Sequence, residues 1–144
     1  VEAVRSLRAE GVLPVVTFQY NEYYTSYAPS KQRSDFALMA DAGAAIVSGS
    51  QSHYPMGMSF SGETFIHYGL GNLFFDQMAY TLADGTVITG TRREFIDRYV
   101  IYDNRLVSVE LLTAMLEDFA RPRPMTPAER VQMLEDIFTA SGWR

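Results

Sequence analysis

Cysteine is absent from the 144-residue sequence, which excludes disulfides, thiolate catalysis, cysteine-ligated zinc and iron–sulfur clusters. Histidine occurs only at His53 and His67, so a metal site built from this chain alone would have few nitrogen ligands. No apolar run approaches the roughly 20 residues that a membrane helix needs, so we expect no membrane span in this chain. The absence of cysteine leaves the cellular compartment open.

Positive charge is also scarce. Lysine and arginine total 12 against 17 aspartates and glutamates, which gives a formal net charge of −5. This balance argues against broad electrostatic capture of nucleic acid or anionic lipid, so we expect no nucleic-acid partner and expect any polyanion to be held locally. Lys31 is the only lysine, and the other basic residues are arginines, which favour planar, bidentate contacts with carboxylate or phosphate.

Length and composition predict one globular core. Hydrophobic residues make up 47% of the chain and charged residues 20%, which excludes intrinsic disorder because enough apolar surface is available to offset chain ordering. The sequence starts at Val1, without methionine and already in a helical pattern, so we expect the natural protein to begin upstream. For that reason the lack of a visible targeting segment says nothing about location.

The first half of the chain carries the pattern of a helix, a strand, a helix and a strand. A helix is predicted over residues 1–11, and the apolar run 12–18 is typical of a strand covered on both faces in a parallel sheet. A tyrosine-rich loop, 19–30, leads to a helix over 31–42 and a buried strand over 44–47. The second helix is expected to turn Phe36, Leu38, Met39 and Ala42 inward. Such a unit joins parallel strands by a right-handed crossover, so both strands end at one edge, where open α/β sheets bind ligands.

The second half reads as hairpins followed by a helical tail. A hairpin is predicted from strands 56–60 and 65–68, a polar loop over 80–90, a second hairpin from strands 94–102 and 105–112, an extended linker over 120–124, and a helix over 127–140. Thr126, Pro127 and Glu129 form a capping-box signature with a first-turn proline at the start of that helix. We therefore divide the chain into 1–119 and a linker with a C-terminal helix over 120–144.

The candidate catalytic residues lie after the two predicted parallel strands. His53 sits in a small, polar loop directly after the second strand, which suits a ligand or a general acid/base, although a plain surface histidine has the same pattern. Glu22 is the one anion in the loop after the first strand and could serve as a base, unless that loop is merely solvated. His67 lies within a predicted strand, where a packed, hydrogen-bonded histidine is the favoured interpretation.

Candidate binding residues surround these two. Tyr20 and Asn21 bring a phenol and an amide to the same sheet edge, and the neighbouring tyrosines either bind a ligand or simply cover the sheet end. Asn72 and Asp76 flank an apolar pair after two glycines, where the functional interpretation is that Asn72 lines a pocket and the alternative is a tight turn.

Several of these segments, taken in order, resemble the CapA family of bacterial poly-γ-glutamate capsule synthesis proteins. They are Val15-Val16-Thr17-Phe18-Gln19-Tyr20, Asp41-Ala42-Gly43-Ala44, Ile46-Val47-Ser48-Gly49, His53, and Tyr68-Gly69-Leu70-Gly71-Asn72-Leu73-Phe74-Phe75-Asp76. The resemblance covers residues 12–78, roughly half of the chain. The later hairpin and the tail helix carry no motif that can be assigned.

The resemblance implies an α/β fold, an α+β four-layer sandwich of the calcineurin-like metallophosphoesterase type, of which residues 1–119 would be the C-terminal part. It implies a divalent metal site at strand ends and a location in the bacterial cell envelope. It also implies a role in making or exporting poly-γ-glutamate or another anionic envelope polymer, with other capsule-synthesis proteins as partners.

The metal ligands that the resemblance implies are altered in this sequence. Gln19 stands where the family has a lone histidine, and Gln51 and His53 stand at the two ends of its His-x-His pair. Amide oxygens bind divalent transition metals more weakly than imidazole does, so this set favours a harder cation or no metal. The family's earlier aspartate, asparagine and histidine ligands would lie upstream of Val1.

Three functions therefore stay open from the sequence. The first is a CapA-like protein of capsule polymer synthesis or assembly with an altered metal site. The second is a metal-dependent hydrolase of phosphoester or amide bonds, in which His53 protonates the leaving group. The third is a non-catalytic module in which tyrosines and arginines bind a polyanion or a carbohydrate.

Overall fold

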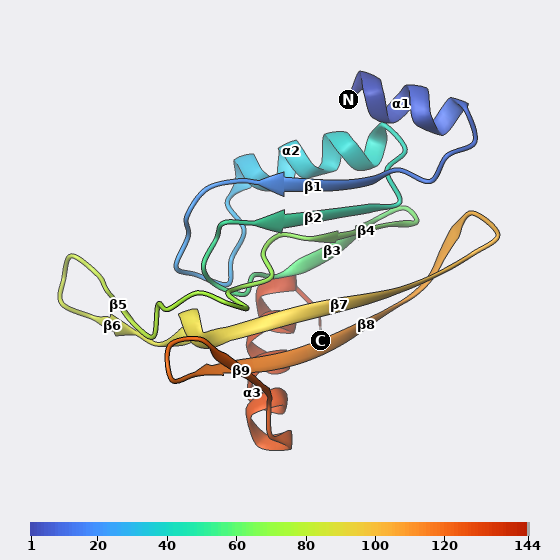
Figure 1. Cartoon of the computed structure of the whole chain (residues 1–144). Coiled ribbons are helices and arrows are strands. Elements are labelled where there is room, and N and C mark those ends of the chain that lie inside the picture. Colours follow the sequence, from blue (N-terminus) through green and yellow to red (C-terminus); the bar gives the residue numbers. More distant parts are fainter. Residues whose placement is uncertain (144) are drawn as a thin grey trace.

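A four-stranded sheet carries the predicted site. The computed structural model describes residues 1–143, and its first sheet contains β1 (Val15–Gln19), β2 (Ile46–Ser50), β4 (Thr64–His67) and β3 (Met58–Ser61), in that order (Figure 1). The strands β1, β2 and β4 are parallel, whereas β3 pairs antiparallel with β4. Both the predicted parallel pair and the predicted first hairpin are thereby confirmed.

Two helices cover one face of this sheet. The helices α1 (Glu2–Ala9) and α2 (Ser30–Asp41) lie together on the same side of it (Figure 1). Phe36 of α2 is fully buried and packs with Val47 of β2 and other apolar residues from the same side. The helix stops where the sequence predicts, because Gly43 adopts a positive φ of 101° that other residues rarely tolerate.

Two burial predictions for this layer are wrong. Strand β1 is not covered on both faces: it alternates between exposed and half-buried residues, and Val15 is 51% exposed. One face of β1 packs against the helices. The other face is exposed because β1 is the edge strand of the sheet and the second sheet packs against the other strands. In α2, Leu38 is exposed and Gln32 is buried instead, because the Gln32 amide donates a 2.7 Å hydrogen bond to the Tyr68 carbonyl.

A long hairpin forms the second sheet. The strands β7 (Arg93–Tyr102) and β8 (Arg105–Glu117) pair antiparallel around a two-residue turn. Both turn residues, Asp103 and Asn104, have positive φ, as a type I′ hairpin turn requires. The predicted hairpin is confirmed, and β8 runs five residues further than the pattern indicates.

The segment predicted as a polar loop contains short regular structure. The strands β5 (Tyr80–Thr81) and β6 (Val87–Ile88) form a two-stranded ribbon, and the 3-10 helix η1 (Gly90–Arg92) connects it to β7. In Figure 1 this ribbon projects on the side of the molecule where β1 and β2 end. The prediction of a plain loop is therefore wrong. The strands of the ribbon have two residues each, which is too short to give a period-2 pattern in the sequence.

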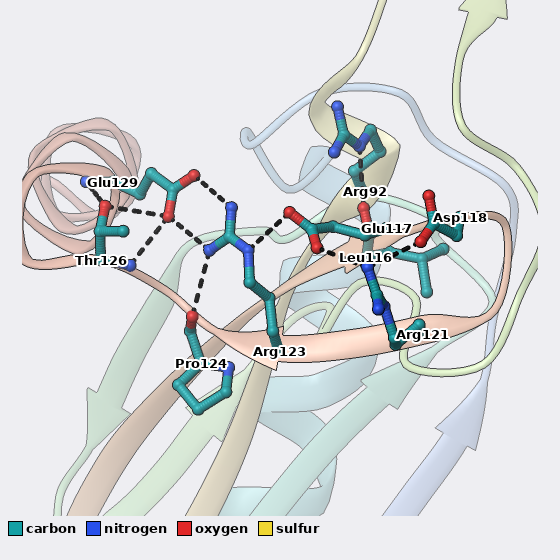
Figure 2. Close-up of polar contacts among 9 residues, drawn as sticks. All are labelled: Arg92, Leu116, Glu117, Asp118, Arg121, Arg123, Pro124, Thr126 and Glu129. Carbon is teal, nitrogen blue, oxygen red and sulfur yellow. Dashed lines mark hydrogen bonds and ion pairs between the residues drawn. The ribbon is translucent and has the colours of Figure 1, made fainter.

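The C-terminal segment extends the second sheet and adds a helix. Residues predicted as an extended linker form β9 (Arg121–Pro124), which pairs with β8, and α3 (Pro127–Ser141) follows. The predicted capping box is present: Glu129 accepts from the Thr126 backbone N–H at 2.8 Å. Arg123 donates to both Glu129 and Glu117, which ties β9 to β8 and to the start of α3 (Figure 2). The boundary near residue 119 stays a prediction.

The core between the two sheets contains one buried polar pair. Phe65 of β4, Phe95 of β7 and Ile137 of α3 pack together there, each at most 3% exposed. Between them, His67 and Asp97 face each other with Nδ1 2.7 Å from Oδ2 and with both side chains buried. The prediction of His67 as a packed, hydrogen-bonded histidine is confirmed, as is the α/β fold class. Within residues 1–143 no helix combines the length and the apolarity that crossing a membrane demands.

Candidate functional site

The candidate site lies where β1 and β2 end. In the parallel register Gln19 pairs with Ser50, so the loops that follow both strands leave the sheet at one edge. The backbone is constrained there: Gln51 and His53 both have positive φ, 75° and 54°. Non-glycine residues rarely adopt this conformation, and the exceptions concentrate at functional sites.

Contacts on two sides hold His53 in place. Its Nδ1 lies 2.8 Å from the Asn72 Oδ1, and its ring stacks on Phe75 with the centroids 4.5 Å apart. The Asn72 amide nitrogen donates to the Thr91 carbonyl at 3.0 Å, which orients the Asn72 oxygen toward His53. Because that oxygen can only accept, the proton of a neutral His53 resides on Nδ1, and Nε2 presents its lone pair to the site.

Three side chains gather on the Nε2 side of His53. The Glu22 carboxylate lies 3.7 Å from Nε2, and the Gln51 amide nitrogen lies 3.5 Å from Nε2 and donates to Glu22 at 3.4 Å. Gln19 in turn donates to the Gln51 oxygen at 3.0 Å. We call Gln19, Glu22, Gln51, His53 and Asn72 the His53 cluster; its members were all named as candidates from the sequence, and the structure brings them together.

The structure does not bring Tyr20 or Asp76 into this cluster. Side chains alternate along β1, so Tyr20 points to the face opposite Gln19, toward the helices. Its hydroxyl donates to Asp35 at 2.6 Å, and this hydrogen bond, with burial, raises the Tyr20 pKa to about 12. Asp76 is exposed and contributes a backbone carbonyl to the Met78 N–H, while Asn21 is also exposed. Tyr20 therefore holds the loop that follows β1 against α2.

Sequence reasoning missed several residues that shape the site. Ser52 is 2% exposed, donates to the Tyr54 carbonyl at 2.8 Å and accepts from the Tyr23 N–H at its own carbonyl, which joins the two loops. The carbonyl of Thr91, a fully buried residue, accepts the hydrogen bond from the Asn72 amide, and the Phe75 ring stacks on His53. Phe75 lies within the recognised motif, but nothing in the local pattern signals Ser52 or Thr91, because their roles depend on segments far apart in the chain.

The donor set of the cluster limits what metal it could hold. It offers one imidazole, one carboxylate and three side-chain amides. Within residues 1–143 no group of three or more histidine, cysteine, aspartate or glutamate side chains comes close enough to hold a metal ion. This set does not fit a centre of two transition metals, because such centres rely on several imidazole and carboxylate ligands.

A comparison with protein-family models identifies the chain. The model described as bacterial capsule synthesis protein PGA_cap matches residues 1–77, more than half of the sequence. The chain belongs to this capsule synthesis family. The match spans β1, β2 and the hairpin and ends at the last residues of the recognised motif, so the predicted resemblance is confirmed. No curated protein matches the chain.

Family membership gives the fold and the site a common context. A capsule synthesis protein of this family has a metallophosphoesterase-like fold, and the sheet edge that carries the His53 cluster lies inside the matched region. Membership also indicates association with the cell envelope and involvement with its polymer. The β7–β8–β9 sheet and α3 lie beyond the matched residues.

Proposed function

We propose that this chain acts in the assembly of an anionic capsule polymer, poly-γ-glutamate in particular, and that the polymer contacts the His53 cluster. The observation that carries the proposal is the convergence of three separate segments of the family-matched region on one constrained sheet edge. Gln19, Glu22 and Gln51 meet there on the Nε2 side of His53, and the Nδ1 side of that ring is held by Asn72, which is 5% exposed. Other capsule-synthesis proteins of the envelope would be the partners.

The cluster suits a polymer that carries both amides and carboxylates. A side-chain amide can donate to and accept from a peptide group at the same time, and Gln19 and Gln51 place two such amides next to each other. The imidazole Nε2 of His53 adds an acceptor, or a donor once it is protonated. Because the cluster has a single carboxylate, Glu22, which is about half exposed, a bound polymer can displace it toward solvent.

Polymer binding by matched variants tests this proposal. We expect poly-γ-glutamate of defined length to bind the wild-type chain in calorimetry, and His53→Ala and Gln51→Ala each to weaken binding by about tenfold, the effect of losing one or two hydrogen bonds. Gln132→Ala is the control, since Gln132 lies on α3 and contacts Asp136. Equal affinity in all four proteins would place the polymer elsewhere, and absence of binding to the wild type would reject the proposal.

A second function, a metal-dependent hydrolase of phosphoester or amide bonds, is favoured by one feature of the geometry. The His53 Nε2 is oriented by Asn72 and lies 3.7 Å from Glu22, an arrangement in which imidazole can exchange a proton with a leaving group. A divalent ion at this edge would need Glu22 and the amide oxygens of Gln19 and Gln51 beside that imidazole.

Metal content distinguishes the two functions. If the chain is a hydrolase, protein purified without chelator should carry near-stoichiometric metal by elemental mass spectrometry, and His53→Ala should lose it along with any turnover. Replacing Gln19 and Gln51 together by histidine should then raise metal uptake, because imidazole is the stronger ligand. Unchanged uptake in the double variant would mean that these side chains do not face a shared metal position.

A further inference from the structure

A hollow of about 480 Å³ lies beside the His53 cluster, at the base of the β5–β6 ribbon. Its walls include Tyr54, Thr89, Gly90, Arg92 and Arg93, with apolar residues of β6 closing one side. The Tyr54 ring occupies the space that a Cβ of Gly90 would need, so only glycine lets this aromatic wall approach the backbone. We call this space the Arg92 hollow.

The Arg92 hollow is positively charged. It has two arginines and no carboxylate among its lining residues. Arg93 is neutralised, because it forms a 2.7 Å ion pair with Asp136 and also donates to the Tyr54 hydroxyl. Among residues 1–143 Arg92 donates through Nε alone, to the Leu116 carbonyl at 2.9 Å, and Figure 2 shows its guanidinium with no other contact among the residues drawn.

Arg92 is the arginine of the hollow that has no direct ion pair among residues 1–143. Glu117 is near enough to feel it, but the Glu117 carboxylate is already held by Arg123, which is the main reason that its pKa is lowered, and by Arg121. Arg92 forms no ion pair of its own within the part of the chain that the structure describes. A fixed guanidinium with free terminal N–H groups, in a chain whose net charge is −5, marks a local preference for anions.

The space on the other side of the Tyr54–Arg93 wall has the opposite character. That second hollow, of about 500 Å³, has Glu135 and Asp136 of α3 and the loop tyrosines in its lining. Two carboxylates there against one shared arginine disfavour an anionic ligand. The anion preference is therefore confined to the Arg92 hollow and does not extend along the whole cleft.

One covalent link and one hydrogen-bonded link join the Arg92 hollow to the His53 cluster. Tyr54 directly follows His53 in the chain. On the other side, Asn72 contacts the His53 ring and donates to the Thr91 carbonyl, and Thr91 directly precedes Arg92. These links fix the position of the Arg92 hollow relative to the His53 ring.

We infer that the Arg92 hollow is an oxyanion-binding subsite that takes a carboxylate or phosphate group next to the group held at the His53 cluster. The binding of an anion at Arg92 does not depend on the proposed function. Only the placement of the rest of the ligand at the His53 cluster rests on that function. The terminal N–H groups of Arg92 supply a planar fork that matches two oxygens of one anion, and Thr89 also lines the hollow.

The guanidinium signals of the folded chain test this subsite directly. In ¹⁵N NMR the Nε–H of Arg92, fixed by Leu116, should shift on titration with γ-glutamylglutamate or with inorganic phosphate, and the stronger response identifies the oxyanion. Arg92→Gln should weaken the preferred ligand by about tenfold or more, and Arg92→Lys by less, since lysine keeps the charge without the fork. Arg98→Gln, an exposed arginine paired with Glu110, is the control and should bind as the wild type.

Each outcome decides either the subsite or the wider function. If neither titrant moves the Arg92 signal, or if Arg92→Gln binds as the wild type, the subsite is rejected, even where poly-γ-glutamate still binds through His53. If small anions bind at Arg92 and the polymer does not bind, the subsite holds and the proposed polymer function fails. Loss of polymer affinity in both Arg92→Gln and His53→Ala, with Arg98→Gln unchanged, supports the two together.

Discussion

Glu94 should make the folded chain less stable at neutral pH than at pH 5. The side chain is 1% exposed, and neither carboxylate oxygen has a hydrogen-bond partner within residues 1–143. It lies on β7 opposite Ala114 of β8 and beside Gly71, whose backbone forms an isolated bridge with it. Burial without a partner disfavours the charged form and raises the Glu94 pKa from 4.5 to about 7.

The raised pKa converts into a pH-dependent loss of stability. The unfolded chain releases the Glu94 proton near pH 4.5, whereas the folded chain holds it until about pH 7, so the folded state binds more protons in between. The free energy of unfolding therefore falls as pH rises through this window, by about 3 kcal/mol in total, and the loss is complete above the folded-state pKa. In a domain of this size that amounts to roughly 10 °C in Tm.

Thermal unfolding of Glu94→Gln at pH 5 and pH 8 measures this effect. Glutamine keeps the shape and cannot ionise, so the variant should match the wild type at pH 5 and exceed its Tm at pH 8. Glu110→Gln serves as the control, because Glu110 is exposed on the same sheet and paired with Arg98. A Tm difference between Glu94→Gln and the wild type that is the same at both pH values would refute the reasoning.

Two further predictions concern the scaffold around the site. Glu129→Gln should destabilise the chain at pH 7 by about 1 kcal/mol, because Arg123 and the helix cap lower the pKa of Glu129 to about 2. The stability that the Glu129 carboxylate contributes is present above about pH 4.5 and is lost toward pH 2. The denaturant midpoints of wild type and variant should therefore converge toward pH 2. Gly49→Ala should destabilise by about 2 kcal/mol or more, because its Cβ would clash with the Tyr68 carbonyl and press on Phe36, and an unchanged urea midpoint would contradict that packing.

Local patterns in the sequence account for most of the elements. The apolar run and the glycine stop of Gly43 locate the strand–helix–strand unit, and the turn residues Asp103 and Asn104 locate the long hairpin, because each signal lies within a few residues of the structure that it specifies. The His53 cluster was also found in advance, because parallel strands joined by a crossover must end at the same edge. The motif around Asn72 added the third segment of that site.

The sequence by itself determined which residues could act; only the tertiary structure decided what surrounds them. Tyr20 lies outside the predicted site because side chains alternate along β1, and Leu38 is exposed because α2 turns the face with Gln32 and Phe36 toward the sheet. The Arg92 hollow and the unpartnered carboxylate of Glu94 had no local signal at all. Both depend on which distant segments lie opposite in the folded chain. The Leu116 carbonyl of β8 and the Asp136 carboxylate of α3 become partners of Arg92 and Arg93 only when the chain has folded.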